Sequence, residues 1–244
     1  SASSVTENVS GAIIGAFTAT DQDASDTHTF KLVEGDGDDS NSFFTINSNG
    51  QLVTKTGLNF EEVSIHSVRV IVTDAAGASL QKVFTISVTD ANDAPTNISI
   101  DNVSLAENLG AGHEVGTFSI TDEDASESHT LSLTSGNGSD DNDLFTISDS
   151  KLLTAADLDF EEQSVFKIRV KAEDGAGSTY ESTFSINVEN VNDAPGNLKL
   201  SKSYIDENLE ANAIIGSLSA ADEDANESLT FSLVTGAGDT DNSD

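Results

Sequence analysis

The chain contains no cysteine, methionine or tryptophan, and only two of its 244 residues are proline. Because cysteine is absent, no disulfide can stabilise the fold, so added stability has to come from packing or from a bound ligand. No run of about 18 apolar residues occurs, so no direct membrane insertion is expected. Hydrophobic residues still make up 36% of the chain, which is enough for a buried core.

Basic residues are also scarce, with ten Lys and Arg against 43 Asp and Glu, for a net charge of −33. This balance argues against nucleic acid as a partner, because phosphates are bound by Lys and Arg, and against an anionic membrane surface. The sequence has no Gly-x-Ser-x-Gly elbow, P-loop or zinc ligand set, so no enzyme is expected. His28 and His129 match Leu229 of a later repeat, so we predict that they pack rather than bind metal.

Both prolines end the same motif, Asn-Asp-Ala-Pro, at 92–95 and at 192–195. Most other features also recur about 100 residues apart, a normal size for one small domain. The recurring motifs are Glu-Asn at 7, 107 and 207, Asp-x-Asp at 21, 122 and 222, Leu-x-Phe-Glu-Glu at 58 and 158, and Arg-Val at 69 and 169. We therefore predict three repeats, at 1–93, 94–193 and a partial one at 194–244, from a longer tandem array.

Apolar and polar residues alternate, as in Phe166, Ile168 and Val170, which is typical of half-buried antiparallel strands. For the second repeat this pattern predicts strands at 97–105, 114–121, 128–134, 144–148, 151–154, 164–173 and 178–189, with one short helical turn within 157–163. Seven short strands in such a length indicate an all-β fold of tandem seven-stranded Greek-key β-sandwiches, immunoglobulin-like in architecture, with the third repeat truncated. Its first strands cannot close a sandwich, so we expect this segment to be poorly ordered or completed by another chain.

The recurring acids are clustered in expected loops and strand ends, with few cations near them. Asp, Glu and Asn supply the hard oxygen ligands that Ca²⁺ prefers, and a divalent ion would relieve the repulsion between the carboxylates. The acidic loop 35–39 is an exception, because it lacks the glycine and glutamate of an EF-hand, and we interpret it as a solvated loop.

In their order and spacing, the motifs Glu-Asn, Asp-x-Asp, Leu-Asp-x-Glu, the Asp after Arg-Val, and Asp-x-Asn-Asp resemble the cadherin-like repeats of large bacterial surface adhesins. The resemblance covers the whole chain and implies about three Ca²⁺ ions at each linker between repeats. Its implied metal ligands at the first linker are Glu7, Asn59, Glu61, Asp90, Asn92, Asp93, Asp122, Asp124 and Asp174, with the carbonyls of Ala91 and Ala94. At the second linker they are Glu107, Asp159, Glu161, Asn190, Asn192, Asp193, Asp222 and Asp224.

This chain departs from the family pattern at two positions. Asn59 and Asn190 each stand where the family or the other linker has Asp, so each linker is expected to bind one ion more weakly or to lose it. The second linker also has no counterpart of Asp174. Asp21, Asp23 and Asp74 match the upper ligands of a linker before Ser1, and without that linker they are expected to hold fewer ions or none.

The resemblance implies calcium-binding tandem extracellular repeats that rigidify a cell-surface adhesin and support calcium-dependent cell adhesion. A pure spacer role competes with a module that itself binds carbohydrate or a second copy. The expected partners are other repeats of the same chain, with homophilic or polysaccharide contact as further options. The expected location is extracellular, at the cell surface or secreted. The absence of cysteine and the near-identical repeats favour a bacterial origin, although Asn-x-Ser sequons such as Asn137-Gly138-Ser139 leave an animal origin open.

Overall fold

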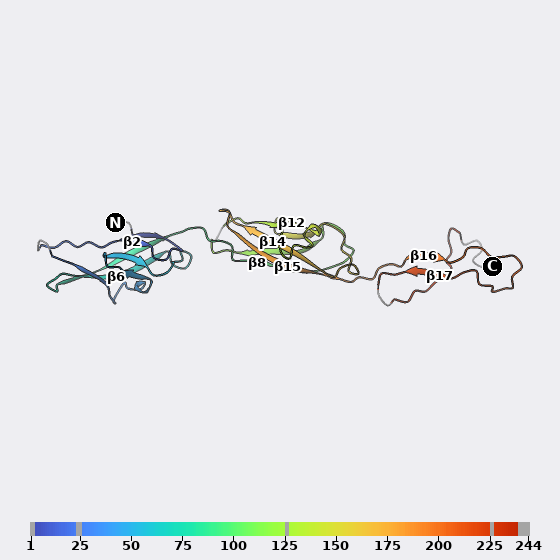
Figure 1. Ribbon diagram of the computed structural model, residues 1–244, viewed down its shortest axis with the longest axis horizontal. Helices are drawn as coiled ribbons and strands as arrows, with labels where there is room; N and C mark the ends of the chain where they lie inside the picture. The colour runs from blue at the N-terminus through green and yellow to red at the C-terminus, as the bar shows by residue number, and fades with distance from the viewer. Residues whose placement is uncertain (1–2, 23–25, 125–126, 225–226, 239–244) are drawn as a thin grey trace. The chain divides into compact units, whose positions relative to one another are not determined.

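The computed structural model describes residues 3–22, 26–124, 127–224 and 227–238. The chain divides into two compact units (Figure 1). Unit 1 comprises Ser1–Thr96, Thr121–Ser128 and Asp174–Ser178, and unit 2 comprises Asn97–Ile120, His129–Glu173 and Thr179–Asp244. Two loops of the second repeat that carry acids, 121–128 and 174–178, therefore belong to unit 1.

The first repeat forms two sheets within unit 1. Its strands are β1 (Ser4–Thr6), β2 (Ile13–Ala16), β3 (Thr29–Leu32), β4 (Phe44–Ile46), β5 (Gln51–Thr54), β6 (Ile65–Thr73) and β7 (Ser79–Thr89), with a 3-10 turn η1 (Asn41–Phe43) before β4. One sheet has the order β1-β7-β6-β3 and the other β2-β5-β4. The short β1 runs parallel to β7, and the β6–β7 hairpin is antiparallel. Seven strands in two layers confirm the predicted sandwich.

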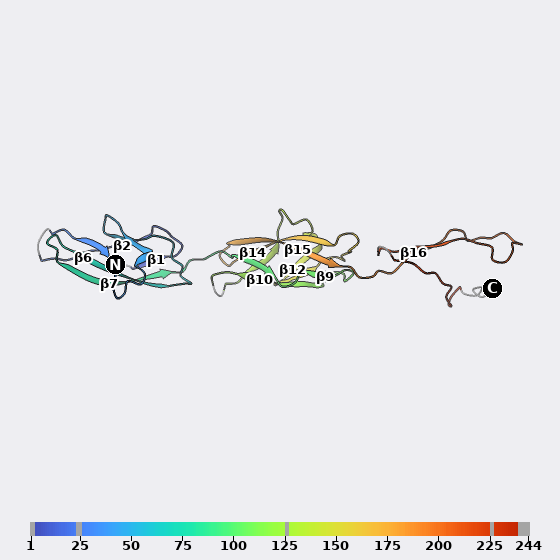
Figure 2. The same cartoon turned by 90° about the horizontal axis from the view of Figure 1, so that it is seen from below.

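The second repeat has the same two-layered plan with one additional strand, and its layers are visible around β14, β15 and β10 in Figure 2. Its strands are β8 (Asn97–Ile100), β9 (Ser104–Ala106), β10 (Glu114–Thr121), β11 (Thr130–Leu133), β12 (Phe145–Ser148), β13 (Lys151–Thr154), β14 (Val165–Glu173) and β15 (Thr179–Glu189), with a 3-10 turn η2 (Asn142–Leu144). The sheet orders are β12-β13-β10-β8 and β11-β14-β15-β9.

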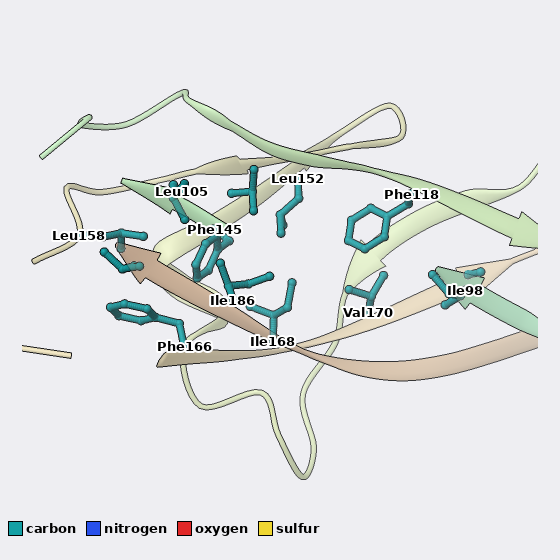
Figure 3. Packing of buried hydrophobic residues seen from close by; sticks show 13 residues of the cluster. Ile98, Leu105, Phe118, Phe145, Leu152, Leu158, Phe166, Ile168, Val170 and Ile186 are labelled. Carbon is teal, nitrogen blue, oxygen red and sulfur yellow. The ribbon is translucent and has the colours of Figure 1, made fainter. Parts of the chain in front are cut away.

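The core of the second repeat lies between these two sheets (Figure 3). Phe166, Ile168 and Val170 of β14 point inward and are almost fully buried, whereas the residues that alternate with them are more exposed. They meet Leu152 and Phe118 from the opposite sheet. The period-two pattern of the sequence is thus explained by one strand face buried against the other layer.

The single strand predicted at 97–105 is divided between the two sheets. β8 joins β10, whereas β9 pairs in parallel with β15. The division falls at two polar residues. Asp101 Oδ1 accepts the Thr117 N–H at 2.7 Å, and the Asn102 amide donates to the carbonyls of Ser104 and Val115, both at 2.7 Å. These bonds turn the chain from one sheet to the other.

The helical turn predicted within 157–163 consists of one hydrogen bond, from Gln163 N–H to the Asp159 carbonyl at 3.0 Å, and does not continue into a helix. Within the described ranges, the third repeat contributes an antiparallel pair of strands, β16 (Gly196–Leu200) and β17 (Leu218–Ala221). Every residue of β16 is exposed. No helix in the described part of the chain is long and apolar enough to span a bilayer.

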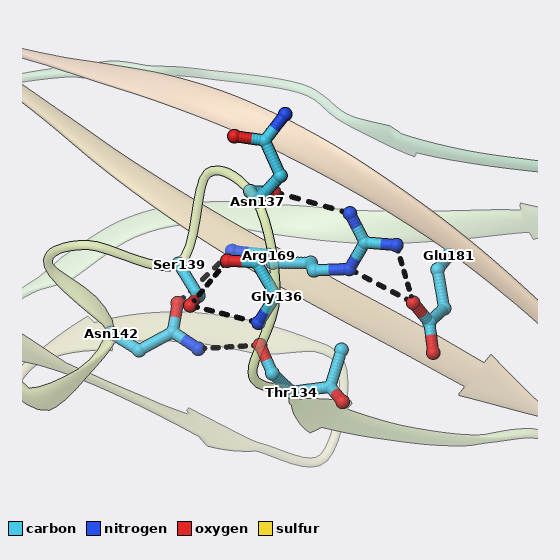
Figure 4. A network of polar contacts seen from close by, with 7 residues as sticks. All are labelled: Thr134, Gly136, Asn137, Ser139, Asn142, Arg169 and Glu181. Atoms are coloured by element: carbon cyan, nitrogen blue, oxygen red, sulfur yellow. Dashed lines mark hydrogen bonds and ion pairs between the residues drawn. The ribbon is translucent and has the colours of Figure 1, made fainter.

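Arg169 of β14 secures a neighbouring loop (Figure 4), and Arg69 of β6 does the same in the first repeat. The Arg169 guanidinium donates to Glu181 at 2.7 and 2.9 Å and to the Asn137 carbonyl at 3.1 Å. In the first repeat, Arg69 makes the matching bond to the Asp36 carbonyl at 2.8 Å. The acidic loop 35–39 is therefore held through its backbone, and its Asp38 carboxylate accepts the Gly35 N–H at 3.0 Å.

Candidate metal centres

A buried glutamate lies at the centre of the acidic residues of unit 1. Glu7 follows β1 and is only 1% exposed. Its Oε2 accepts the Phe60 N–H at 2.6 Å, and its Oε1 accepts the Ala91 N–H at 2.8 Å. The parallel pairing of β1 with β7 places Glu7 beside the chain that leaves β7, because the Glu7 N–H bonds the Thr89 carbonyl at 3.2 Å. One carboxylate thus connects three segments that are distant in sequence.

Unit 2 repeats this arrangement around Glu107, which is 2% exposed. Its oxygens accept the N–H groups of Phe160 at 2.6 Å and Val191 at 2.8 Å. The following asparagine also has the same role in both units. Asn8 and Asn108 adopt positive φ angles of 61° and 60°, and each amide donates to an aspartate. These aspartates are Asp93 at 2.9 Å and Asp193 at 2.8 Å.

The remaining predicted ligands of the first linker lie together around Glu7 in unit 1, and we call this set the first acidic cluster. Carboxylate oxygens of Glu7, Glu61 and Asp90 lie within 4.8 Å of one another. The Asp93 N–H donates to Asp124 at 2.7 Å. The same cluster includes Asp122, whose Oδ1 accepts the Asp124 N–H at 3.2 Å, and Asp174, whose Oδ2 accepts the Asn92 amide at 2.9 Å. Asn59 also belongs to the cluster, because its amide donates a hydrogen bond to Glu123, an acid that was not predicted as a ligand.

The second acidic cluster, formed by the predicted ligands of the second linker, lies within unit 2. Oxygens of Glu107, Asp159 and Glu161 lie within 4.8 Å of one another. The Asn190 amide donates to Glu161 at 2.6 Å and to Asp224 at 3.3 Å. Asp224 also accepts the Asp193 N–H at 2.6 Å, and its own N–H bonds Asp222 at 3.2 Å. The Asn192 amide donates to the Asp193 carbonyl at 2.7 Å.

Desolvation and mutual repulsion raise the pKa values of four acids, two in each cluster. Burial first, and then neighbouring carboxylates, raise the pKa values of Glu61, Asp93, Glu161 and Asp193 above the ordinary values. Asp174 shows the opposite shift, because the Asn92 amide and backbone N–H groups hold its pKa below the usual range. Ionising most of these acids together is therefore unfavourable.

The donor set fits a hard divalent cation. Oδ2 of Asp93 and Oδ2 of Asp222 are buried without a hydrogen-bond partner, although buried oxygens normally have one. A hollow of about 630 Å³ in unit 1 is lined by acids that include Glu61, Asp90 and Asp124. The site is rich in oxygen ligands and negatively charged, and few Lys or Arg side chains are present to balance that charge. These are the properties that a Ca²⁺ site requires.

Sequence reasoning missed three acids that the structure places at such sites. Glu123 and Glu127 line the hollow in unit 1, and Asp26 joins Asp21 and Asp74 within 4.8 Å. Asp23, which was predicted to accompany Asp21, lies outside the described residues. Glu123 stands between the two aspartates of Asp122-Glu123-Asp124, so the unbroken acidic run was the signal available. His28, for which packing was predicted, lies with Nε2 3.3 Å from Asp21.

Comparison with known sequences gives one consistent family. The profile described as Cadherin domain matches residues 1–89 and 101–189. Cadherin-3 of Caenorhabditis elegans is 30% identical over 243 residues, covering 95% of this chain and 7% of that protein. Protocadherin gamma-A1 of Homo sapiens is 31% identical over 194 residues, covering 76% of this chain and 21% of that protein. The chain therefore spans a small part of the length of these relatives.

Solved structures show the same similarity. The protocadherin GammaB4 extracellular domain matches with a TM-score of 0.59 and 28% identity, covering 90% of this chain and 36% of that one. The structure described as the protocadherin gammaB7 EC3-6 cis-dimer matches with a TM-score of 0.57 and 26% identity, covering 90% and 53%.

Proposed function

This chain belongs to the cadherin family, whose domains are extracellular adhesion domains rather than enzymes, and from this premise we propose that it binds calcium in both acidic clusters. Bound calcium then stiffens a tandem extracellular array that supports calcium-dependent adhesion. We propose repeat boundaries at 1–93, 94–193 and 194–244. The observation that carries the proposal is the repeated arrangement around Glu7 and Glu107, each a buried carboxylate that connects three segments.

In the first cluster, Glu7, Asn59, Glu61, Asp90, Asn92, Asp93, Asp122, Asp124 and Asp174 would hold the ions. Bound calcium would supply positive charge that neutralises these carboxylates. Glu7 holds the turn after β5 and the chain after β7 in place through its two backbone hydrogen bonds. Asp93 and Asn92 then connect that chain to the loops carrying Asp124 and Asp174. Neutralising the charges lets these short contacts persist, which is the proposed source of stiffness.

In the second cluster, Glu107, Asp159, Glu161, Asn190, Asn192, Asp193, Asp222 and Asp224 would hold the ions. Asn190 occupies the position of Asp90, and its amide is a donor that satisfies Glu161 and Asp224 instead of adding a charge. This cluster is therefore proposed to bind calcium more weakly than the first.

Contact with a second copy is the partner that the comparisons favour, because one similar structure is described as a cis-dimer. We extend that contact to this chain as a proposal. No feature of the described residues favours the alternative polysaccharide contact, and bacterial origin also stays a prediction, since the curated relatives named above come from animals.

Calcium titration by calorimetry, paired with thermal melting in Ca²⁺ and in a chelator, tests the proposal. Saturable binding and a higher melting temperature in Ca²⁺ are expected. Glu7→Gln and Glu107→Gln should each weaken binding at one cluster. Glu207→Gln is the matched control, because Glu207 belongs to the same repeated motif but is exposed. Absence of binding by the unaltered protein would refute the proposed function.

A further inference from the structure

The two acidic clusters differ at one position in the turn that follows each core leucine. In unit 1, Asn59 has a single side-chain oxygen, which accepts the Glu62 N–H at 2.6 Å. In unit 2, the matching Asp159 uses Oδ1 for the Glu162 N–H at 3.0 Å. The aspartate therefore keeps a second, charged oxygen, and one of its oxygens lies within 4.8 Å of Glu107 and Glu161. The asparagine has an NH₂ group in its place, which donates hydrogen bonds and cannot bind a cation.

The Asn59 amide donates to a carboxylate instead. Its Nδ2 lies 2.5 Å from Oε2 of Glu123, the central residue of Asp122-Glu123-Asp124. A Glu123 oxygen also lies within 4.8 Å of oxygens of Glu61 and Asp93. The Glu62 N–H donates to the amide oxygen of Asn59, and the Glu123 carboxylate accepts from the amide nitrogen. These two contacts determine the orientation of the amide, so the nitrogen and not the oxygen faces Glu123.

We infer that Glu123 is an additional calcium ligand of the first acidic cluster and supplies the carboxylate that Asn59 lacks. The inference rests on the proposed calcium-binding function. Glu123 belongs to unit 1 and lines its acidic hollow together with Asp90 and Asp124. The buried Asp93 Oδ2, which has no hydrogen-bond partner, belongs to the same group of acids. Asn59 then positions Glu123 through its amide nitrogen and offers the ions only its one neutral oxygen, whereas Asp159 offers a carboxylate.

The positions of the acids in the two clusters agree with this exchange of roles. In the first cluster, oxygens of Glu123, Glu61 and Asp93 lie within 4.8 Å of one another. In the second cluster, the corresponding group is formed by Asp159 with Glu107 and Glu161. Glu223, the sequence counterpart of Glu123, is exposed.

The test compares Glu123→Gln with the matched control Glu223→Gln in the full chain. Calcium affinity is measured by calorimetry. Hydrogen exchange of the segments 90–96 and 190–196 reports each cluster separately. Glu123→Gln should weaken calcium binding at the first cluster by about tenfold or more, the usual range for losing a metal-site partner. Glu223→Gln should leave both segments unchanged. Melting in chelator should show Glu123→Gln folded and no less stable than the unaltered protein, since repulsion is relieved.

A rescue variant separates ligation from a merely structural role. Asn59→Asp keeps an acceptor for the Glu62 N–H and adds a charged oxygen, so it should restore calcium affinity to Glu123→Gln. Unchanged affinity in Glu123→Gln, or failure of the rescue, would overturn the inference while the calcium-binding function stands. Absence of calcium binding by the unaltered protein would overturn both.

Discussion

Single residues decide how much charge each cluster can carry. Glu7 is almost fully buried, yet both of its oxygens accept backbone N–H groups, which offsets the cost of removing a carboxylate from water. By contrast, Asp93 keeps a buried oxygen without a partner. The satisfied carboxylate organises the backbone, and the unsatisfied one is available to a cation.

His66 is the second residue whose surroundings determine its chemistry. It is 4% exposed, Nδ1 lies 2.9 Å from the Ser40 hydroxyl, and Nε2 is buried without a partner. The rings of Phe43 and Phe44 lie 5.5 and 5.8 Å away. Burial lowers the pKa of His66 below the ordinary 6.5. His66 is therefore protonated at a lower pH in the folded protein than in the unfolded chain.

His66→Phe, which installs the residue found at 166, tests this point. Because the lowered pKa favours folding only when the imidazole is neutral, unit 1 should lose stability as the pH falls below 6.5. The variant should not show this loss. At pH 8 its stability should change by less than about 1 kcal/mol, because removing the unsatisfied Nε2 is offset by leaving the buried Ser40 hydroxyl without its His66 partner. Denaturant unfolding at pH 5 and pH 8 in chelator measures both effects. The exposed His113→Gln is the control, and an unchanged pH profile in His66→Phe would contradict the assignment.

At the scale of elements, a bulge accompanies the division of the first strand of the second repeat. The register of β10 against β13 shifts between Glu114 and Gly116. A Cβ at Gly116 would lie 2.5 Å from the Asn102 carbonyl oxygen and 2.8 Å from Asp101 Oδ1. The close approach of these backbones is what lets β8 leave one sheet and β9 enter the other.

Gly116→Ala should therefore destabilise unit 2 by about 1–3 kcal/mol, because backbone atoms cannot move aside as a flexible side chain would. Denaturant unfolding in Ca²⁺ measures the change. Gly196→Ala is a suitable control, since a Cβ added there would meet nothing within 4 Å. Equal stability of the two variants would show that the crossing between sheets tolerates a side chain.

For the whole chain, the dominant property is a net charge of −33, part of which is concentrated in two clusters. Raised pKa values in Glu61, Asp93, Glu161 and Asp193 mean that the folded state takes up protons at a pH where the unfolded chain does not. Proton uptake and metal binding therefore compete for the same oxygens.

In chelator, stability should fall as the pH rises from the ordinary carboxylate values near 4 through the raised ones, because the folded carboxylates then lose their protons. Calcium affinity should change in the opposite sense and rise with pH. Thermal melting measures the stability and calorimetry measures the calcium affinity across this pH range. The His66→Phe background is used so that titration of the His66 imidazole does not contribute to the stability profile. Glu61→Gln with Glu161→Gln should flatten the chelator profile. If the stability of this variant in chelator still fell by the same amount with rising pH, groups other than Glu61 and Glu161 would be responsible for the pH dependence.

Much of the fold follows from the sequence, because a strand with one buried face must alternate and a 100-residue period must repeat the fold. The predicted strands at 114–121, 151–154 and 164–173 match β10, β13 and β14 within a residue. The gathering of acids at the linkers also followed from motif order. These features are local or periodic, so they can be recognised from the order of residues along the chain.

Contacts between distant segments were decided by the tertiary structure alone. Polar bonds of Asp101 and Asn102 to β10 divide the first strand of the second repeat, and no pattern within 97–105 signals them. Likewise, the sequence marks Asn59 as a lost charge, but only the fold brings Glu123 to its amide. The physical reason is that hydrogen bonding and charge depend on distance in space, which the spacing of residues along the chain does not contain.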